Sequence, residues 1–210
     1  MADIFDEINE ELKQDRMTAL WQRYGKYLIA VVVAIVAGVS LSQGYSYYTN
    51  KRDARSADAF FQAILADDVT SSLEAAAPDL NEGYGLLAEF RSAAALAQNG
   101  QAGEAEQRYL ALAARSDADQ IYRDIALLLS VMHAPQSADA ADLQVRLEPL
   151  TASSSSLQGL ALEQMAALDL RRGDTAAAID RLNRLVALTD IPASLRQRAA
   201  QILSVISQSQ

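Results

Sequence analysis

The side chains able to do chemistry are few in this chain and lie apart from one another. There is no cysteine, so disulfides and thiolate catalysis are both excluded. The only histidine, His133, follows an apolar run and precedes Pro135. Because it has no cysteine or second histidine as a metal partner, we expect it to satisfy carbonyl groups at a helix end.

The remaining polar groups fit structural roles better than catalysis. The acid pairs Asp67-Asp68 and Glu104/Glu106 are expected in loops or first helical turns, where the helix dipole favours acidic groups. The hydroxyl run over residues 153–156 has neither a base nor a nucleophile elbow beside it. No glycine-rich phosphate loop occurs in the sequence. We therefore predict a protein that is not an enzyme and uses no metal or cofactor.

The composition predicts helices as the elements that build the functional surface. Half of the 210 residues are hydrophobic but only 6% are aromatic, and alanine and leucine dominate. Proline and glycine are few, and long alternations of β-branched residues are missing, which favours closely packed helices. The net charge of −9 argues against nucleic-acid binding, which needs clustered lysine and arginine. We expect an all-α fold with a solvated acidic surface.

An uncharged stretch of twenty-four residues, Tyr27–Asn50, dominates the N-terminal part. Residues 27–48 would form about 33 Å of helix at about 1.5 Å per residue, enough to cross a hydrocarbon core of about 30 Å. Aromatic residues bracket the stretch as they do at membrane interfaces: Trp21, Tyr24, Tyr27, Tyr45, Tyr47 and Tyr48. We predict a transmembrane helix over 27–48, kept as a signal anchor.

Three other interpretations of this stretch fit less well. An interfacial helix would need a polar face, but Leu28 to Leu41 is apolar all round. A buried helix of a soluble protein would not need aromatic and basic residues at both ends. A cleaved signal peptide could use the small residues of Ser40-Leu41-Ser42, but the region before it is long and acidic for a signal sequence. Four basic residues precede the span closely and three follow it, which favours a cytoplasmic N-terminus.

The segment before the anchor, residues 1–26, is predicted to be amphipathic and cytoplasmic. Ile4, Ile8 and Leu12 recur at the spacing of one helical turn, with acidic residues between them. This apolar stripe would dock on a partner or on the membrane. The alternative is a solvated helix with one weakly buried side.

Residues 49–210 contain a repeated spacing of a glycine, an alanine and a large apolar residue. The two clear copies are Gly100, Ala105, Tyr109 and Gly173, Ala178, Leu182. Each glycine is expected to end a helix in the left-handed conformation, and each alanine to allow two helices to cross closely. The large residue would then pack on the partner helix of the pair.

The two copies lie seventy-three residues apart, which is close to two periods of thirty-six residues. A degenerate middle copy is therefore expected at Gln136, Ala141 and Val145. Helical pairs follow over about 84–116, 118–150 and 157–189, with a looser connection over 67–80 and a last helix from Ser194 to about Ile206. A helix-turn-helix unit of this length resembles the tetratricopeptide repeat. A generic bundle of helical hairpins is the alternative. The predicted fold is one membrane helix followed by an α-solenoid.

Five features carry a resemblance that covers the whole chain: an acidic N-terminal helix (Asp3, Asp6, Glu7, Glu10, Glu11), the run Leu20-Trp21-Gln22-Arg23-Tyr24-Gly25-Lys26-Tyr27, the uncharged stretch, Tyr45 to Tyr48 with Arg52, and the repeats near Gly100 and Gly173. With these features the chain resembles the YfgM-like family, ancillary subunits of the bacterial Sec translocon. Members of that family carry a tetratricopeptide-like periplasmic domain.

The resemblance implies a location, partners and a role. It implies a single-pass protein of the bacterial inner membrane, with a cytoplasmic N-terminus and a periplasmic repeat domain. It also implies contact with SecYEG and a periplasmic chaperone, in support of the export or folding of secreted proteins. The alternative function is a structural scaffold of the cell envelope that organises division or outer-membrane assembly factors.

Overall fold

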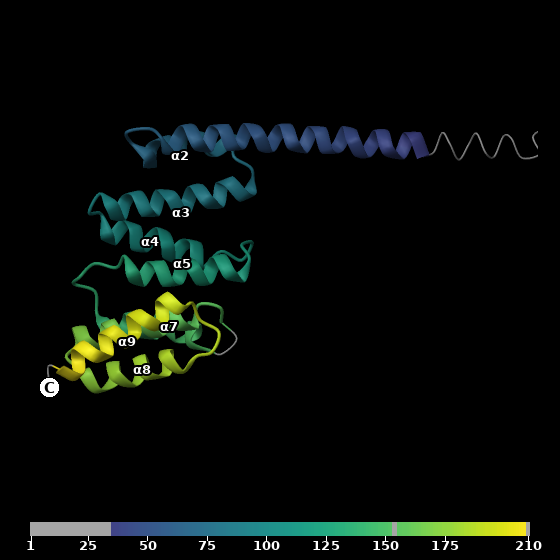
Figure 1. The fold of residues 1–210 in the computed structure, drawn as a ribbon. Helices are drawn as coiled ribbons and strands as arrows, with labels where there is room; N and C mark the ends of the chain where they lie inside the picture. The colour runs from purple at the N-terminus through teal and green to yellow at the C-terminus, as the bar shows by residue number, and fades with distance from the viewer. Residues whose placement is uncertain (1–34, 153–154, 209–210) are drawn as a thin grey trace, which may run out of the picture. The chain divides into compact units, whose positions relative to one another are not determined.

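The computed structural model describes residues 35–152 and 155–208, and every regular element in these ranges is helical (Figure 1). The predicted all-α fold is confirmed for this part of the chain. The protein divides into two compact units, Met1–Arg55 and Ser56–Gln210.

Residues 35–64 are helical. Tyr45, Tyr47 and Tyr48 lie on this helix and are largely exposed. Among the described residues, no helix is both long and apolar enough to cross a membrane. Residues 27–34 of the predicted span lie outside the described residues, as do Trp21, Tyr24 and the amphipathic segment 1–26.

The second unit continues through eight α-helices that the structure describes and two short 3₁₀ segments. Their bounds are α2 Val69–Ala76, η1 Ala77–Asp79, α3 Glu82–Gln98, α4 Ala102–Ala113, α5 Gln120–Met132, α6 Ala140–Leu147, η2 Glu148–Thr151, α7 Gln158–Arg171, α8 Thr175–Ala187 and α9 Ala193–Gln208. The pairs α3/α4, α5/α6 and α7/α8 fall close to the three predicted ranges.

The prediction of a looser connection over 67–80 is wrong, because this segment contains α2. The Asp68 carboxylate accepts a hydrogen bond from the Ser71 N–H at 3.1 Å and so caps the helix start. Leu73 is buried against Phe60 and Ala88. Ser56 holds the turn that follows, since its hydroxyl donates to the Asp79 carbonyl at 2.9 Å.

The core of the second unit is a series of hydrophobic clusters in chain order. The first surrounds Phe60 and Leu73, the next Tyr109, then Leu147 and finally Leu182. In Figure 1, α3, α4 and α5 lie in successive layers, and α7, α8 and α9 gather beyond them. Each helical pair therefore buries its apolar face against its neighbours in the chain, as in repeat proteins.

The position predicted for the middle copy is wrong by one residue. Ala141 and Val145 face solvent, and Val145 is 67% exposed. The buried residues of α6 are instead Ala140, Leu143, Gln144 and Leu147, and Ala140, Gln144 and Leu147 are the three that repeat the earlier pattern. Their spacing matches that of Ala105, Tyr109, Leu112 and of Ala178, Leu182, Leu185. The shift arises because no glycine ends α5, and a seven-residue turn separates it from α6 where the glycine copies have turns of three.

Gly100 and Gly173 end their helices in the left-handed region, with φ of 80° and 78°. After Gly100, the Gln101 N–H donates to the Leu96 carbonyl at 2.9 Å. After Gly173, the Asp174 N–H donates to the Asp169 carbonyl at the same distance. This bonding is the Schellman motif, which satisfies the last carbonyl groups of a helix and turns the chain sharply into the next one.

Replacing Gly100 or Gly173 with alanine should lower the free energy of unfolding by about 1 kcal/mol or more, because a Cβ strains a residue with positive φ. Gly103→Ala is the matched control, since Gly103 lies within α4 and an added Cβ would meet only the Pro135 ring, at 3.9 Å. Urea denaturation followed by circular dichroism measures the difference. Equal stability of the three variants would contradict this role of the two glycines.

Candidate functional site

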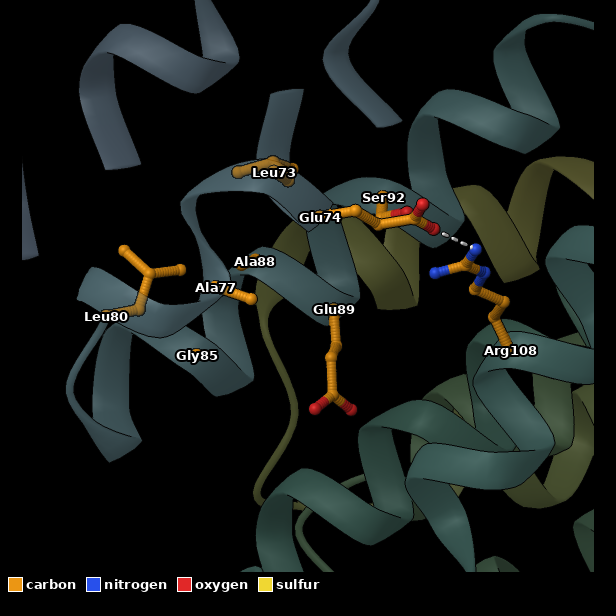
Figure 2. Close-up of a pocket in the computed structure, with 9 residues that line it drawn as sticks. All are labelled: Leu73, Glu74, Ala77, Leu80, Gly85, Ala88, Glu89, Ser92 and Arg108. Carbon is orange, nitrogen blue, oxygen red and sulfur yellow. Dashed lines mark hydrogen bonds and ion pairs between the residues drawn. The ribbon is translucent and has the colours of Figure 1, made fainter. Parts of the chain in front are cut away.

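A hollow of about 230 Å³ lies between α2, α3 and α4 (Figure 2). Its lining residues come from all three helices and the turn after α2: Leu73, Glu74, Ala77, Leu80, Gly85, Ala88, Glu89, Ser92 and Arg108. Most are apolar or small, and the charged ones are exposed. The hollow therefore combines an apolar interior with a charged rim.

Helix α3 supplies one side of the hollow, and its start is well held. The Asn81 side chain accepts a hydrogen bond from the Tyr84 N–H at 3.0 Å, which caps the helix. Gly85 follows in the first turns of α3, and a Cβ built there would meet no atom within 4 Å. Glycine is not required by the backbone at this position, and its lack of a side chain leaves the hollow open.

Ser92 is the only described residue with a buried side-chain polar atom that lacks a hydrogen-bond partner. The residue is 2% exposed and lines the hollow from α3. A serine within a helix commonly bonds to a carbonyl one turn earlier, but this hydroxyl does not. Buried polar groups are nearly always bonded, so an unpaired hydroxyl here needs an explanation.

Two ion pairs border the hollow. Arg108 of α4 donates to Glu74 of α2 at 2.5 Å, which is the dashed line in Figure 2. In the second pair, Arg115 donates to Glu89 at 2.7 Å. Arg115 also donates to Asp117, which is outside the lining, at 2.6 Å. The Asp117 and Glu89 carboxylates raise the pKa of Arg115, and Arg115 lowers the pKa of Asp117. Such exposed pairs add little stability, so their main effect is on the charge that a ligand meets.

A second, polar hollow of about 360 Å³ adjoins the first and shares Arg108 with it. Its acidic residues are Asp67, Asp68 and Glu104. The hydroxyl and the amide N–H of Ser71 hold the pKa of Asp68 below its ordinary value. Asp68 is therefore ionised at neutral pH, and this side of the domain carries negative charge.

The cap at Asp68 should make α2 sensitive to acid. Because the folded pKa lies below the ordinary value of 3.8, the contribution of Asp68 to stability is fully present above pH 3.8 and is lost as pH falls through the folded pKa. The stability difference between the wild type and Asp68→Ala should therefore narrow in acid. Asparagine at this position keeps a hydrogen-bond acceptor but does not titrate. The stability difference between Asp68→Asn and Asp68→Ala should therefore stay the same as pH falls. Denaturation midpoints measured at several pH values test this.

A buried polar cluster joins the second and third helical pairs. Asp169 of α7 is 2% exposed and accepts hydrogen bonds from Gln144 of α6 and from Arg181 of α8, the latter at 2.5 Å. Arg172 donates to the Gln144 side-chain oxygen at 3.0 Å. Gln144 occupies the place that Tyr109 and Leu182 hold in the other pairs, so this cluster replaces an apolar contact there.

The six residues predicted to pack the repeats lie at helix ends and on buried helix faces of the second unit. Gly100 and Gly173 form the two sharp turns, while Ala105, Tyr109, Ala178 and Leu182 are each at most 1% exposed. His133 caps the end of α5, and its ring stacks on Tyr109 with the ring centres 5.5 Å apart. Within the described residues, no group of histidine and acidic side chains is arranged to hold a metal ion.

The sequence pattern does not predict the hollow. Ser92 and Gly85 are small residues in a helix, and Glu74 and Arg108 are separated by thirty-four residues. That separation is close to one repeat period, which is the only signal in the sequence that could have suggested the Glu74–Arg108 pair.

Helical pairs that turn at Schellman glycines, bury alanines and stack along the chain define a helical-repeat protein. The tetratricopeptide repeat-like domain family matches residues 18–189, and this chain belongs to that family. No curated protein and no solved structure matches it. Repeat domains of this kind are typically interaction modules without enzymatic activity, which supports a role in binding other proteins.

Proposed function

We propose that this chain is a membrane-anchored scaffold for protein–protein interaction, an accessory of the Sec translocon that aids the export or periplasmic folding of secreted proteins. The observation that carries the proposal is the family match, because residues 18–189 take in the uncharged stretch as well as the helical pairs. The resemblance in the run from Leu20 to Tyr27 supports the finer assignment.

The anchor would be the stretch 27–48, with residues 1–26 in the cytoplasm and residues 49–210 in the periplasm of the bacterial inner membrane. The absence of any charge between Tyr27 and Asn50, together with aromatic and basic residues at both ends, supports a single span. An anchored repeat domain would be held beside the translocon exit, where secreted chains emerge unfolded.

Protease protection on inverted inner-membrane vesicles tests the topology. Residues 49–210 should resist added protease until detergent opens the vesicles, because they lie inside. A tag placed before Met1 should be cleaved without detergent. A repeat domain that is digested in intact inverted vesicles would exclude the periplasmic assignment.

Photocrosslinking in intact membranes tests the partners. A photoreactive residue placed at Leu87 or Tyr122, both exposed in the second unit, should capture Sec subunits or a periplasmic chaperone. Repeated failure to recover either with the intact protein would overturn the translocon assignment. Products dominated by division or outer-membrane assembly factors would instead favour a structural scaffold of the envelope.

A further inference from the structure

We propose that the hollow between α2, α3 and α4 binds one apolar side chain of a partner polypeptide, in a segment that also carries basic residues. The proposal rests on the proposed function only in taking the ligand to be a protein. It assigns a site, an anchor residue type and a charge preference to the binding surface.

The size and lining of the hollow select a side chain as its occupant. Pockets for small molecules and cofactors usually have volumes of about 300–1,000 Å³, and this hollow is smaller at about 230 Å³. Leu73, Ala77, Leu80 and Ala88 present apolar surface in it. An aliphatic side chain from a partner would be removed from water there without displacing any helix, which is how anchor residues bind.

Ser92 indicates that the occupant brings a polar group together with its apolar one. The Ser92 hydroxyl is buried in the wall of the hollow and has no partner among the described residues. A polypeptide carries carbonyl and N–H groups at a short, fixed distance from every side chain. When an aliphatic side chain enters the hollow, its own backbone can therefore bond to Ser92, whereas a purely apolar ligand would leave the hydroxyl unpaired.

Charge around the hollow selects the flanking residues of the partner. Arg108 is the only basic residue that lines the two adjoining hollows in the described part of the chain, and Glu74 pairs with it. Asp67, Asp68 and Glu104 lie in the adjoining hollow, and residues 51–210 as a whole carry fourteen basic and twenty-one acidic groups. Lysine or arginine beside the anchor residue complements this surface and steers the encounter.

The test uses the full chain in detergent and a fluorescent peptide that has one leucine flanked by lysines and serines. Gly85→Leu should fill the hollow, because Gly85 lines it and a Cβ there meets no atom within 4 Å, and should weaken binding about tenfold or more. Gly83→Leu is the matched control on the same helix, since Gly83 is exposed and outside the lining. It should bind the peptide as the wild type does. Fluorescence anisotropy measures the affinities.

Two further sets of changes, in the peptide and at Ser92, complete the test. Their results do not depend on whether the Gly85→Leu variant folds. Replacing the leucine of the peptide with serine, or its lysines with glutamates, should each weaken binding several-fold. Ser92→Ala should weaken it less than Gly85→Leu. Equal binding of the leucine and serine peptides, equal binding by the Gly85→Leu and Gly83→Leu variants, or no binding of the lysine–leucine peptide by the wild type would each overturn the proposal.

The peptide assay needs no translocon and no membrane orientation. Failure of the Sec assignment would leave the peptide affinities unchanged, whereas failure of the hollow would leave Sec crosslinks in place. The two proposals can therefore fail separately.

Discussion

Tyr109→Ala should lower the free energy of unfolding of the repeat domain by about 3–5 kcal/mol, the cost of deleting a large buried aromatic side chain. Tyr109 lies in α4 and is 1% exposed. Its ring contacts Phe90 of α3 at 6.2 Å between centres and stacks on His133 at the end of α5. One side chain therefore joins three helices, and its loss leaves a cavity between two helical pairs.

The loss would be a large part of the stability of a domain of this kind, typically about 5–15 kcal/mol. Urea denaturation followed by circular dichroism measures it. Tyr109→Phe is the control, because it keeps the ring and its contacts, and it should cost less than about 1.5 kcal/mol. A loss for Tyr109→Ala that is no larger than the loss for Tyr109→Phe would contradict the role of the ring.

Tyr109 should also make the stability of the domain depend on pH. Burial raises the pKa of its phenol above the ordinary value of 10.0, so the folded state favours the neutral form. Its contribution to stability is fully present below pH 10.0 and is lost as pH rises through the folded pKa. Tyr109→Phe should therefore lose less stability than the wild type in this alkaline range.

The second large effect is expected at Asp169. Asp169→Ala should lower the free energy of unfolding by about 3 kcal/mol, because it removes one partner of a buried ion pair and leaves Arg181 without a carboxylate. The side chain of Arg181 is 23% exposed, so water can solvate its charge and offset part of this loss. Gln144 also loses its acceptor, which loosens α6 from α7.

Asp180→Ala is the matched control, since Asp180 lies on the exposed side of α8 and should change stability by less than about 0.5 kcal/mol. The double change Asp169→Leu with Arg181→Met should recover part of the loss, because it removes both charges and fills the space with apolar atoms. Equal losses for Asp169→Ala and Asp180→Ala would show that the cluster does not stabilise the junction.

The glycine copies were predictable because a sharp helix–helix turn has a local cause. Gly100 and Gly173 adopt a conformation that favours glycine, and the buried alanine follows at a fixed distance along the next helix. The middle copy was not predictable to the residue. No glycine ends α5, and the length of its turn depends on how α6 docks on α7, where Gln144 meets Asp169.

Helix α2 was not predictable from the sequence, for a different reason. It is eight residues long, and its pattern shows little beyond Leu73 as a buried side chain. Short helices are marginal in isolation, so packing against α3 and the helix that ends at residue 64 decides that it forms. The Asp68 cap was visible in the sequence only as an acid pair in an expected loop.

The sequence by itself determined the helical class, the two glycine turns and the small and large residues that pack the first and third pairs, because periodicity and backbone preference act over a few residues. Only the tertiary structure decided the site. Ser92, Gly85 and Arg108 form one hollow because α3 and α4 pack beside α2 at particular angles. Periodicity indicates which face of each helix is buried, but which residues meet across helices is decided by how the helices dock.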